Sequence, residues 1–144
     1  MIHIFAEPTL PAAVQDELRI LLDEAFPGFF NGRTHIKQQP HFRIVTHQRG
    51  NLITRVELDY RVIRVGAEGV CICGLIDLCV RKHCRGRGIG SRLLEEGEGQ
   101  ARKAGVAFMV LMANRRDIYS RHGLEHVQAT KRSATAGAAV AILR

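Results

Sequence analysis

The chain has 144 residues, a formal net charge of +7 at pH 7 and 46% hydrophobic residues. This length suits one domain with a hydrophobic core, so we expect residues 1–144 to form a single domain. No apolar run reaches the ~18 residues of a membrane span. The first residues, MIHIFAEPTL, lack a basic segment followed by a long apolar one. The sequence therefore predicts a cytoplasmic protein without a membrane anchor or secretion signal.

A short strand is expected first, at residues 2–5, followed by an amphipathic helix at residues 12–25 whose apolar side chains share one face. Pro11 suits the start of this helix, and Pro27 with Gly28 ends it. Residues 29–39 are interpreted as a loop with at most a helical turn. This loop contains Phe30 and His35.

Three antiparallel strands are predicted next, at residues 42–46, 52–65 and 70–80. Glycines in the two connecting segments favour tight turns. The apolar residues of the second strand do not keep one phase, and a bulge near Asp59 would reconcile them.

The most informative stretch, residues 75–95, reads LIDLCVRKHCRGRGIGSRLLE. It combines a buried strand at 75–80, a basic glycine-rich turn at 81–90 and a helix at 91–102. The free N–H groups and the dipole of a helix start favour an anion at such a turn.

The glycines and arginines of this turn have separate roles. Gly86, Gly88 and Gly90 permit positive φ values and a close approach of ligand to backbone. Arg85 and Arg87 add two permanent charges, which suits a pyrophosphate better than a single carboxylate. The alternative is an ordinary strand-to-helix turn with solvated arginines.

Two other nucleotide-binding patterns do not fit this turn. The P-loop ends in Gly-Lys-Ser/Thr, whereas Ser91 here precedes an arginine. The dinucleotide fingerprint needs G-x-G-x-x-G, whereas the glycines here follow G-x-G-x-G.

The remaining chain completes a mixed sheet. A strand at 106–112 should run parallel to 75–80, because a strand–helix–strand unit makes a right-handed parallel crossover. Strands at 125–130 and 138–143 follow. We therefore expect a mixed α/β (α+β) domain with a mainly antiparallel central sheet.

Residues 85–90, RGRGIG, resemble the Arg/Gln-x-x-Gly-x-Gly/Ala signature of the GCN5-related N-acetyltransferases. The strand end before the loop, and residues 114–124 with Leu124 in place of the usual Phe, are also similar to this family. The similarity extends from about residue 52 to residue 127.

The resemblance implies an acyl-CoA N-acyltransferase fold with a sheet of roughly six to seven strands. It also implies acetyl-CoA as co-substrate and an amine as acceptor. The loop would hold the pyrophosphate and the preceding strand end would pair with the pantetheine arm. The cofactor-binding residues implied are Leu78, Cys79, Val80, Arg85, Gly86, Arg87, Gly88, Ile89, Gly90, Ser91 and Asn114.

Tyr119 is the candidate general acid by the same resemblance. Amide formation requires the amine to lose a proton and the leaving thiolate to gain one, and a Tyr hydroxyl near the thioester sulfur is a suitable acid. The spacing from Asn114 to Tyr119 is shorter than in the common form of the family. Otherwise Tyr119 is a packed helix residue with its hydroxyl in solvent.

Asp77 is the only ionisable residue in the strand segment where many family members carry a catalytic Glu. It could take a proton through water, bind a cationic acceptor, or make a structural hydrogen bond. The imidazole groups of His83, His122 and His126 are chemically able to act as a base, but a lone His in a loop is more often a surface residue. Phe30 and His35 are candidates for contacting the acceptor; otherwise Phe30 belongs to the core and His35 to the surface.

The four cysteines, at positions 71, 73, 79 and 84, lack the paired spacing of a zinc site. They are interpreted as buried reduced thiols, and no metal is expected.

The acceptor could be a small amine, an aminoglycoside-like compound or a protein N-terminus. Scattered basic residues, 6% aromatics and no Trp are weak evidence for nucleic acid. A basic nucleic-acid-binding module and a non-catalytic acyl-CoA sensor are the alternatives. A homodimer is suggested only by the general frequency of dimers among oligomeric proteins.

Overall fold

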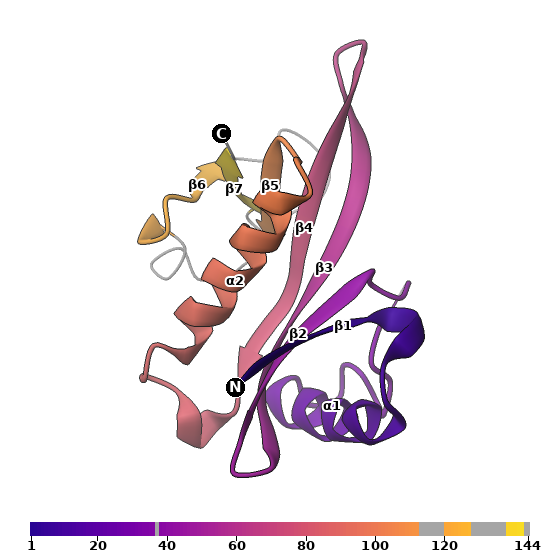
Figure 1. The fold of residues 1–144 in the computed structure, drawn as a ribbon, viewed down its shortest axis with the longest axis vertical. Helices are drawn as coiled ribbons and strands as arrows, with labels where there is room; N and C mark the ends of the chain where they lie inside the picture. Colours follow the sequence, from indigo (N-terminus) through magenta and orange to yellow (C-terminus); the bar gives the residue numbers. More distant parts are fainter. Residues whose placement is uncertain (37, 113–119, 128–137, 143–144) are drawn as a thin grey trace.

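The computed structural model describes residues 1–36, 38–112, 120–127 and 138–142. They form a seven-stranded sheet with the order β1-β2-β3-β4-β5-β7-β6 (Figure 1). Only β4 and β5 pair in parallel among these strands; the other neighbours are antiparallel. The predicted mixed, mainly antiparallel sheet is confirmed. The strands are β1 (Ile2–Ala6), β2 (Phe42–Gln48), β3 (Asn51–Val65), β4 (Glu68–Val80), β5 (Phe108–Met112), β6 (Glu125–Val127) and β7 (Ala138–Ile142).

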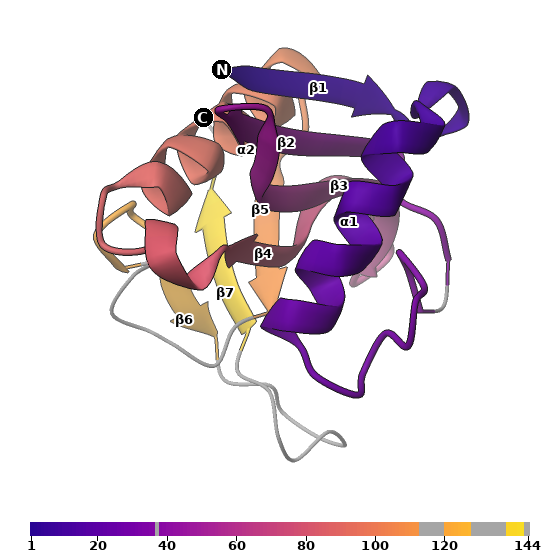
Figure 2. The same ribbon diagram turned by 90° about the horizontal axis from the view of Figure 1, so that it is seen from below.

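Two helices cover opposite faces of the sheet (Figure 2). α1 (Ala12–Ala25) packs on one face in a cluster with Val45 and Leu52, and α2 (Ile89–Lys103) packs on the other in a cluster with Val56 and Leu58. Two short 3-10 helices, η1 (Glu7–Thr9) and η2 (Lys82–Cys84), are also present. None of the described helices is both long and apolar enough to cross a bilayer.

The predicted limits of α1 match the structure. Its buried residues are Val14, Leu18, Leu21 and Leu22, a spacing that places all four on one helical face. Each fully buried leucine contributes about 1.5–3 kcal/mol by leaving water. Pro11 precedes the helix, and the N–H of Phe26 bonds to the carbonyl of Leu22 at its end. The following segment, 29–36 and 38–39, contains no strand or regular helix, as predicted.

The apolar residues of β3 fall on both faces of the strand, and the cause is not the predicted bulge near Asp59. Residues 52–59 are all buried, because α1 covers one face of this strand and α2 the other. A bulge near Asp59 is therefore unnecessary, and that prediction is wrong. The pairing of β3 instead shifts register opposite Thr46 and His47 in β2, and again between Arg55 and Glu57.

The second register shift is a bulge in β4. Arg55 pairs with Cys79 and Glu57 pairs with Ile76, so Asp77 and the next residue lie opposite Val56 alone. Asp77 has a φ of 52°, in the left-handed region that Asp tolerates better than most residues. An extra residue of this kind bends the strand and redirects its side chains.

Strands β4 and β5 pair over a short distance. The parallel pairing joins Ile72–Leu75 with Phe108–Leu111 and goes no further within the described residues. Among the described residues, no strand therefore pairs with the last residues of β4 on this side. The expected parallel pair is confirmed, although it uses residues 72–75 of β4 and not the predicted 75–80.

The β3–β4 hairpin extends beyond the rest of the sheet (Figure 1). β2 pairs with β3 only as far as Leu58, and β5 meets β4 only from Ile72. Residues 61–69 are all exposed. At the other end of the sequence, β6 and β7 confirm the two predicted terminal strands, with β7 between β5 and β6.

Candidate active site

The loop between β4 and α2 is fixed at its base. The N–H of Arg81 donates to the carbonyl of Ile53 at 2.7 Å, and the N–H of Cys84 donates to the carbonyl of Arg81 at 2.8 Å. Cys84 is 1% exposed, so it anchors η2 against the protein. This anchoring leaves the residues after Cys84 to form the exposed turn.

Two left-handed glycines carry the chain from η2 into α2. Gly86 has a φ of 75° and Gly88 a φ of 73°, as the sequence predicted. The prediction of a positive φ is wrong for Gly90, which lies in the first turn of α2. A Cβ at Gly90 would lie 3.4 Å from Val80 Cγ2, whereas a Cβ at Gly86 or Gly88 would meet no atom within 4 Å. The surface in front of these two glycines is therefore open to a ligand.

The helix begins two residues earlier than predicted, at Ile89, with Gly88 as its N-cap. The N–H of Arg92 bonds to the carbonyl of Gly88 at 3.2 Å, so the N–H groups of Ile89, Gly90 and Ser91 precede the first intrahelical bond. No side chain caps this helix start. Free donors and the positive end of the helix dipole together favour an anionic ligand.

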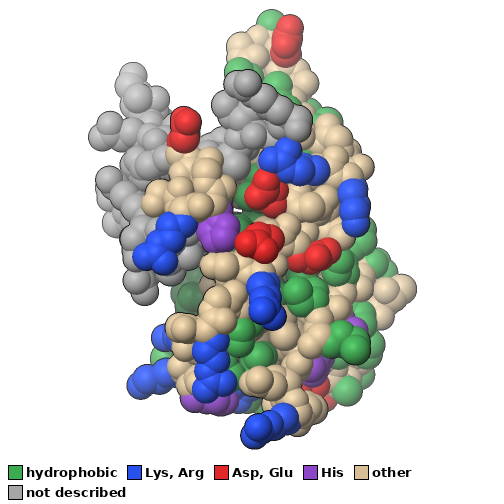
Figure 3. All heavy atoms as spheres, turned by 60° about the vertical axis from the view of Figure 1, so that its left-hand side comes forward, with side chains coloured by type: hydrophobic (Ala, Val, Ile, Leu, Met, Phe, Trp, Pro, Cys, Tyr) green, Lys and Arg blue, Asp and Glu red, His purple; other side chains and the backbone are tan. Residues whose placement is uncertain are grey.

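Basic side chains add to the positive electrostatic potential at the start of α2. Arg85 and Arg87 are exposed, and Arg85 Nε donates to the carbonyl of Val80 at 2.9 Å, which holds it at the end of β4. Lys and Arg side chains gather at the lower end of the face in Figure 3, at the height where this loop lies in Figure 1. The local charge therefore has the sign that a pyrophosphate requires.

Asp77 lies at the β4 bulge with its side chain 30% exposed. Its Oδ2 is 3.9 Å from Arg55 Nη2. Burial raises the pKa of Asp77, while Arg55 and Arg43 act in the opposite direction. The raised pKa makes this carboxylate a better proton acceptor than an ordinary surface Asp.

A chain of buried charges continues from Asp77 across the α1 side of the sheet. Arg55 contacts Glu57, whose Oε1 lies 2.7 Å from Arg43 Nη1. Arg43 Nη2 in turn donates to Glu7 Oε1 at 2.9 Å. Both arginine side chains are fully buried, which requires that their charges be compensated.

Burial is the largest influence on the pKa values of the ionisable groups in and beside this chain of buried charges. It raises the pKa of Glu57 to about 7, against the opposing influence of Arg55 and Arg43. It lowers the pKa of Arg55 and raises that of Cys79 to about 11. Cys79 is therefore a neutral thiol at pH 7, consistent with a structural role.

Arg55 keeps unused donors. Its Nε and Nη1 have no hydrogen-bond partner among the described residues, and its Cζ lies 5.9 Å from the centre of the Phe30 ring. Phe30 is fully buried in the core beneath α1. His35 is half-buried, and its Nδ1 lacks a partner within the same part of the chain.

Sequence reasoning missed Arg43 and Arg55. Arg55, Glu57 and Asp59 alternate along β3 and are all buried, which is unusual for charged residues. This alternation within an otherwise apolar strand was the available signal.

The proposed acid, Tyr119, and Asn114 lie outside the described residues. The chain that follows them returns to the start of α2, where His122 Nε2 lies 3.1 Å from Ser91 Oγ. Leu124 is buried in the cluster that contains Leu93 and Leu94. His83 is exposed on η2.

The cysteines of the chain form no disulfide. All four cysteines are free; Cys73, Cys79 and Cys84 are buried, whereas Cys71 is exposed, so the prediction of burial is wrong for Cys71. The described residues contain no group of three His, Cys, Asp or Glu side chains suited to a metal ion.

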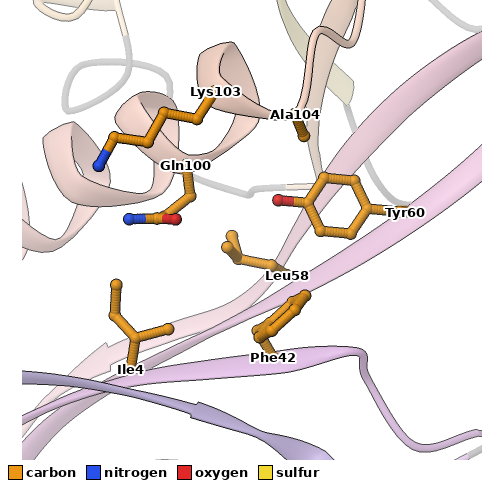
Figure 4. A pocket seen from close by; sticks show the side chains of 7 residues that line it. All are labelled: Ile4, Phe42, Leu58, Tyr60, Gln100, Lys103 and Ala104. Carbon is orange, nitrogen blue, oxygen red and sulfur yellow. The ribbon is translucent and has the colours of Figure 1, made fainter.

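A separate pocket of about 320 Å³ lies at the other end of α2. It is lined by Ile4, Phe42, Leu58, Tyr60, Gln100, Lys103 and Ala104 (Figure 4). The glycine loop is at the N-terminal end of α2, and a 15-residue helix is about 22 Å long. This pocket is therefore distinct from the loop.

The profile of the family described as "Acetyltransferase (GNAT) domain" matches residues 16–127. The chain belongs to this GNAT acetyltransferase family. No curated protein matches the sequence of this GNAT chain.

Solved structures share the GNAT fold of this chain. An aminoglycoside 6'-N-acetyltransferase complexed with coenzyme A has a TM-score of 0.76 and 13% identity, covering 100% of this chain and 97% of that one. YhbS from Escherichia coli, in complex with CoA, has a TM-score of 0.73 and 21% identity, covering 99% and 82%. A GNAT acetyltransferase from Brucella melitensis in complex with acetyl-CoA has a TM-score of 0.66 and 22% identity, covering 96% and 86%.

Proposed function

We propose that this GNAT chain transfers the acetyl group of acetyl-CoA to a primary amine, by direct attack of the amine on the thioester in a ternary complex. The observation that carries the proposal is the uncapped start of α2. There, the left-handed Gly86 and Gly88 lead into a helix start whose first N–H groups, those of Ile89, Gly90 and Ser91, lie beside two arginines that follow the carboxyl end of β4. Such an arrangement is suited to a pyrophosphate.

The residues present fit coenzyme A. The N–H groups of residues 86–91 and the guanidinium groups of Arg85 and Arg87 would hold the pyrophosphate. The open edge of β4 at Leu78, Cys79 and Val80 would pair with the amide groups of the pantetheine arm. Asn114 would complete the cofactor contacts. When bound, acetyl-CoA supplies an activated acyl group as a thioester.

Proton transfer is assigned to two residues of the chain. Asp77 would accept a proton from the acceptor ammonium, directly or through water, because its pKa is raised and its side chain reaches solvent. Tyr119 would donate a proton to the departing thiolate. The amine nitrogen would form the new C–N bond as the C–S bond breaks, and the second proton that the nitrogen loses would replace the one that Tyr119 gives to the thiolate. The products are an amide, a free thiol and one proton held by Asp77.

The charges around Asp77 favour a cationic acceptor. The connected chain holds three carboxylates, Glu7, Glu57 and Asp77, and two guanidinium groups, those of Arg43 and Arg55. Asp77 is the most exposed of these residues, so its carboxylate is the one that an ammonium group arriving from solvent would meet. A small amine, an aminoglycoside-like compound or a protein N-terminus supplies the required ammonium group.

Thiol release from acetyl-CoA, measured against a panel of amines, tests this function. We expect release with at least one amine, and a 10²–10⁴-fold lower kcat for Tyr119→Phe, as is typical for loss of an acid catalyst. Binding of acetyl-CoA must be unchanged in this variant. Acetyl-CoA binding without turnover on any amine would favour an acyl-CoA sensor and contradict the enzyme.

A further inference from the structure

The tip of the β3–β4 hairpin, residues 61–69, carries exposed apolar side chains without cover. Val62 is 70%, Ile63 39% and Val65 54% exposed. A two-stranded ribbon is marginally stable in water on its own. Ile63 and Val65 lie on one face of this ribbon and Val62 on the other, so both faces of the tip offer apolar contacts. The proposed acetyl transfer uses none of these residues.

The outer edge of the hairpin is also unpaired. β2 pairs with β3 only up to Leu58, and the N–H of Tyr60 bonds to His41 Nδ1 at 3.1 Å. No strand in the described part of the chain pairs with the edge of β3 after Tyr60. An unpaired edge offers N–H and C=O groups to a strand of another chain.

Exposed charges normally keep such an edge from pairing, but one of the two arginines here is compensated. Arg61 Nε donates to Asp59 Oδ2 at 2.7 Å, and that carboxylate is buried at the base of the hairpin. Arg64 is exposed, with no charged partner among the described residues. A partner strand must therefore not place a basic residue opposite Arg64.

A second copy of the same strand meets this requirement. When two copies pair antiparallel about Ile63, Arg61 lies opposite Val65 and Arg64 lies opposite Val62, so no like charges face each other. Moving the centre to the point between Val62 and Ile63 would place Arg61 directly opposite Arg64, which is unfavourable. The centred pairing also places Ile63 against Ile63 of the second copy.

We propose that two copies of this chain associate through residues 61–65 of β3, paired antiparallel about a two-fold axis at Ile63. Pairing about a two-fold axis uses each edge once and closes, so it predicts a dimer and not a filament. This inference is independent of the proposed function.

Analytical ultracentrifugation of the full chain tests the proposal. We expect a concentration-dependent dimer for the wild type, and monomers for Ile63→Asp and for Ile63→Lys, because each places like charges at the centre of the interface. Mixing the two variants should restore a dimer, since opposite charges then face each other. Ile20→Asp, on the exposed side of α1, should leave the dimer unchanged. A wild type that is monomeric at all concentrations, a larger oligomer, or an Ile63→Asp dimer would overturn the proposal.

Disulfide trapping tests the register without a disruptive charge. In a Cys71→Ser background, which removes the one exposed native thiol, Ile63→Cys should give a reducible dimer on oxidation. Directly opposite residues bring their Cβ atoms to about 4.5–5.5 Å, close to disulfide distance. Val62→Cys is the matched control, because its counterpart is a diagonal neighbour at about 7–8 Å and should not crosslink. Crosslinking at residue 62 but not at residue 63 would contradict the pairing.

Discussion

Asp77 Oδ2 lies 3.9 Å from Arg55 Nη2, and the two residues differ greatly in exposure. The Asp77 side chain is 30% exposed at a strand bulge, whereas that of Arg55 is fully buried. This contact connects the candidate active site to the buried charges beneath α1. The same carboxylate therefore contacts solvent, where an acceptor would arrive, and a fixed guanidinium group.

Asp77→Asn should lower kcat/KM for the amine while leaving the affinity for acetyl-CoA unchanged. The substitution keeps the size of the side chain and removes its ability to accept a proton, so we expect a 10²–10⁴-fold loss. Steady-state kinetics together with calorimetric titration of acetyl-CoA separates these two effects. Unchanged kinetics in Asp77→Asn would show that Asp77 has a structural role only.

Arg43→Met should destabilise the fold strongly. It leaves the buried carboxylate of Glu7 without its guanidinium partner and Glu57 with Arg55 alone, and breaking a buried pair costs about 3–5 kcal/mol. Denaturant unfolding measures the change. Arg19→Met is the matched control, because Arg19 forms an exposed pair with Asp16 that contributes about 0–1 kcal/mol. Equal losses in the two variants would contradict the importance of the buried chain.

The free energy of unfolding should depend on pH through the titration of the Glu57 carboxyl group. Its pKa is raised from 4.5 to about 7, so the folded state binds more protons than the unfolded state between these values. The stabilising contribution of the proton is therefore complete below pH 4.5 and is lost as the pH rises through about 7. Glu57→Gln should remove this decline, measured as the free energy of unfolding between pH 4.5 and pH 8. A parallel pH profile in wild type and Glu57→Gln would show that Glu57 does not titrate in this range.

Gly88→Ala should weaken acetyl-CoA binding. A side chain at a φ of 73° costs about 1–2 kcal/mol, and relief of that strain would move the free N–H groups of the loop. Gly99→Ala in α2 is the control, because its Cβ meets no atom within 4 Å and its helical position favours alanine by about 0.5–1 kcal/mol. Calorimetric titration should give weaker binding only for Gly88→Ala. Equal affinities in both variants would show that the shape of the loop is unimportant.

The features that the sequence predicted correctly depend on local signals. The spacing of Val14, Leu18 and Leu21 defines α1 without reference to the rest of the chain. Gly86 and Gly88 likewise mark the left-handed turn before α2 by their own conformational freedom.

The missed features depend on the pairing of distant residues. Arg43 is 36 positions from Glu7, and nothing in either segment alone indicates that they meet. A bulge or splay in the strand at 70–80 suits the family resemblance, but its position at Asp77 is set by the register between Arg55 and Cys79, which local patterns do not specify. Burial of β3 on both faces likewise follows from the packing of α1 and α2 on opposite sides, and this removed the need for a bulge near Asp59.

The central claim is that the loop between β4 and α2 binds a pyrophosphate, and thermal unfolding with two acyl donors tests it most directly. Acetyl-CoA and S-acetylpantetheine carry the same thioester and pantetheine arm, but only acetyl-CoA has the pyrophosphate. We predict that acetyl-CoA raises the Tm, with a stabilisation of about 2.7 kcal/mol at a concentration of 100 Kd, and that S-acetylpantetheine at the same concentration does not. An unchanged Tm with saturating acetyl-CoA, or an equal rise with both compounds, would contradict the account.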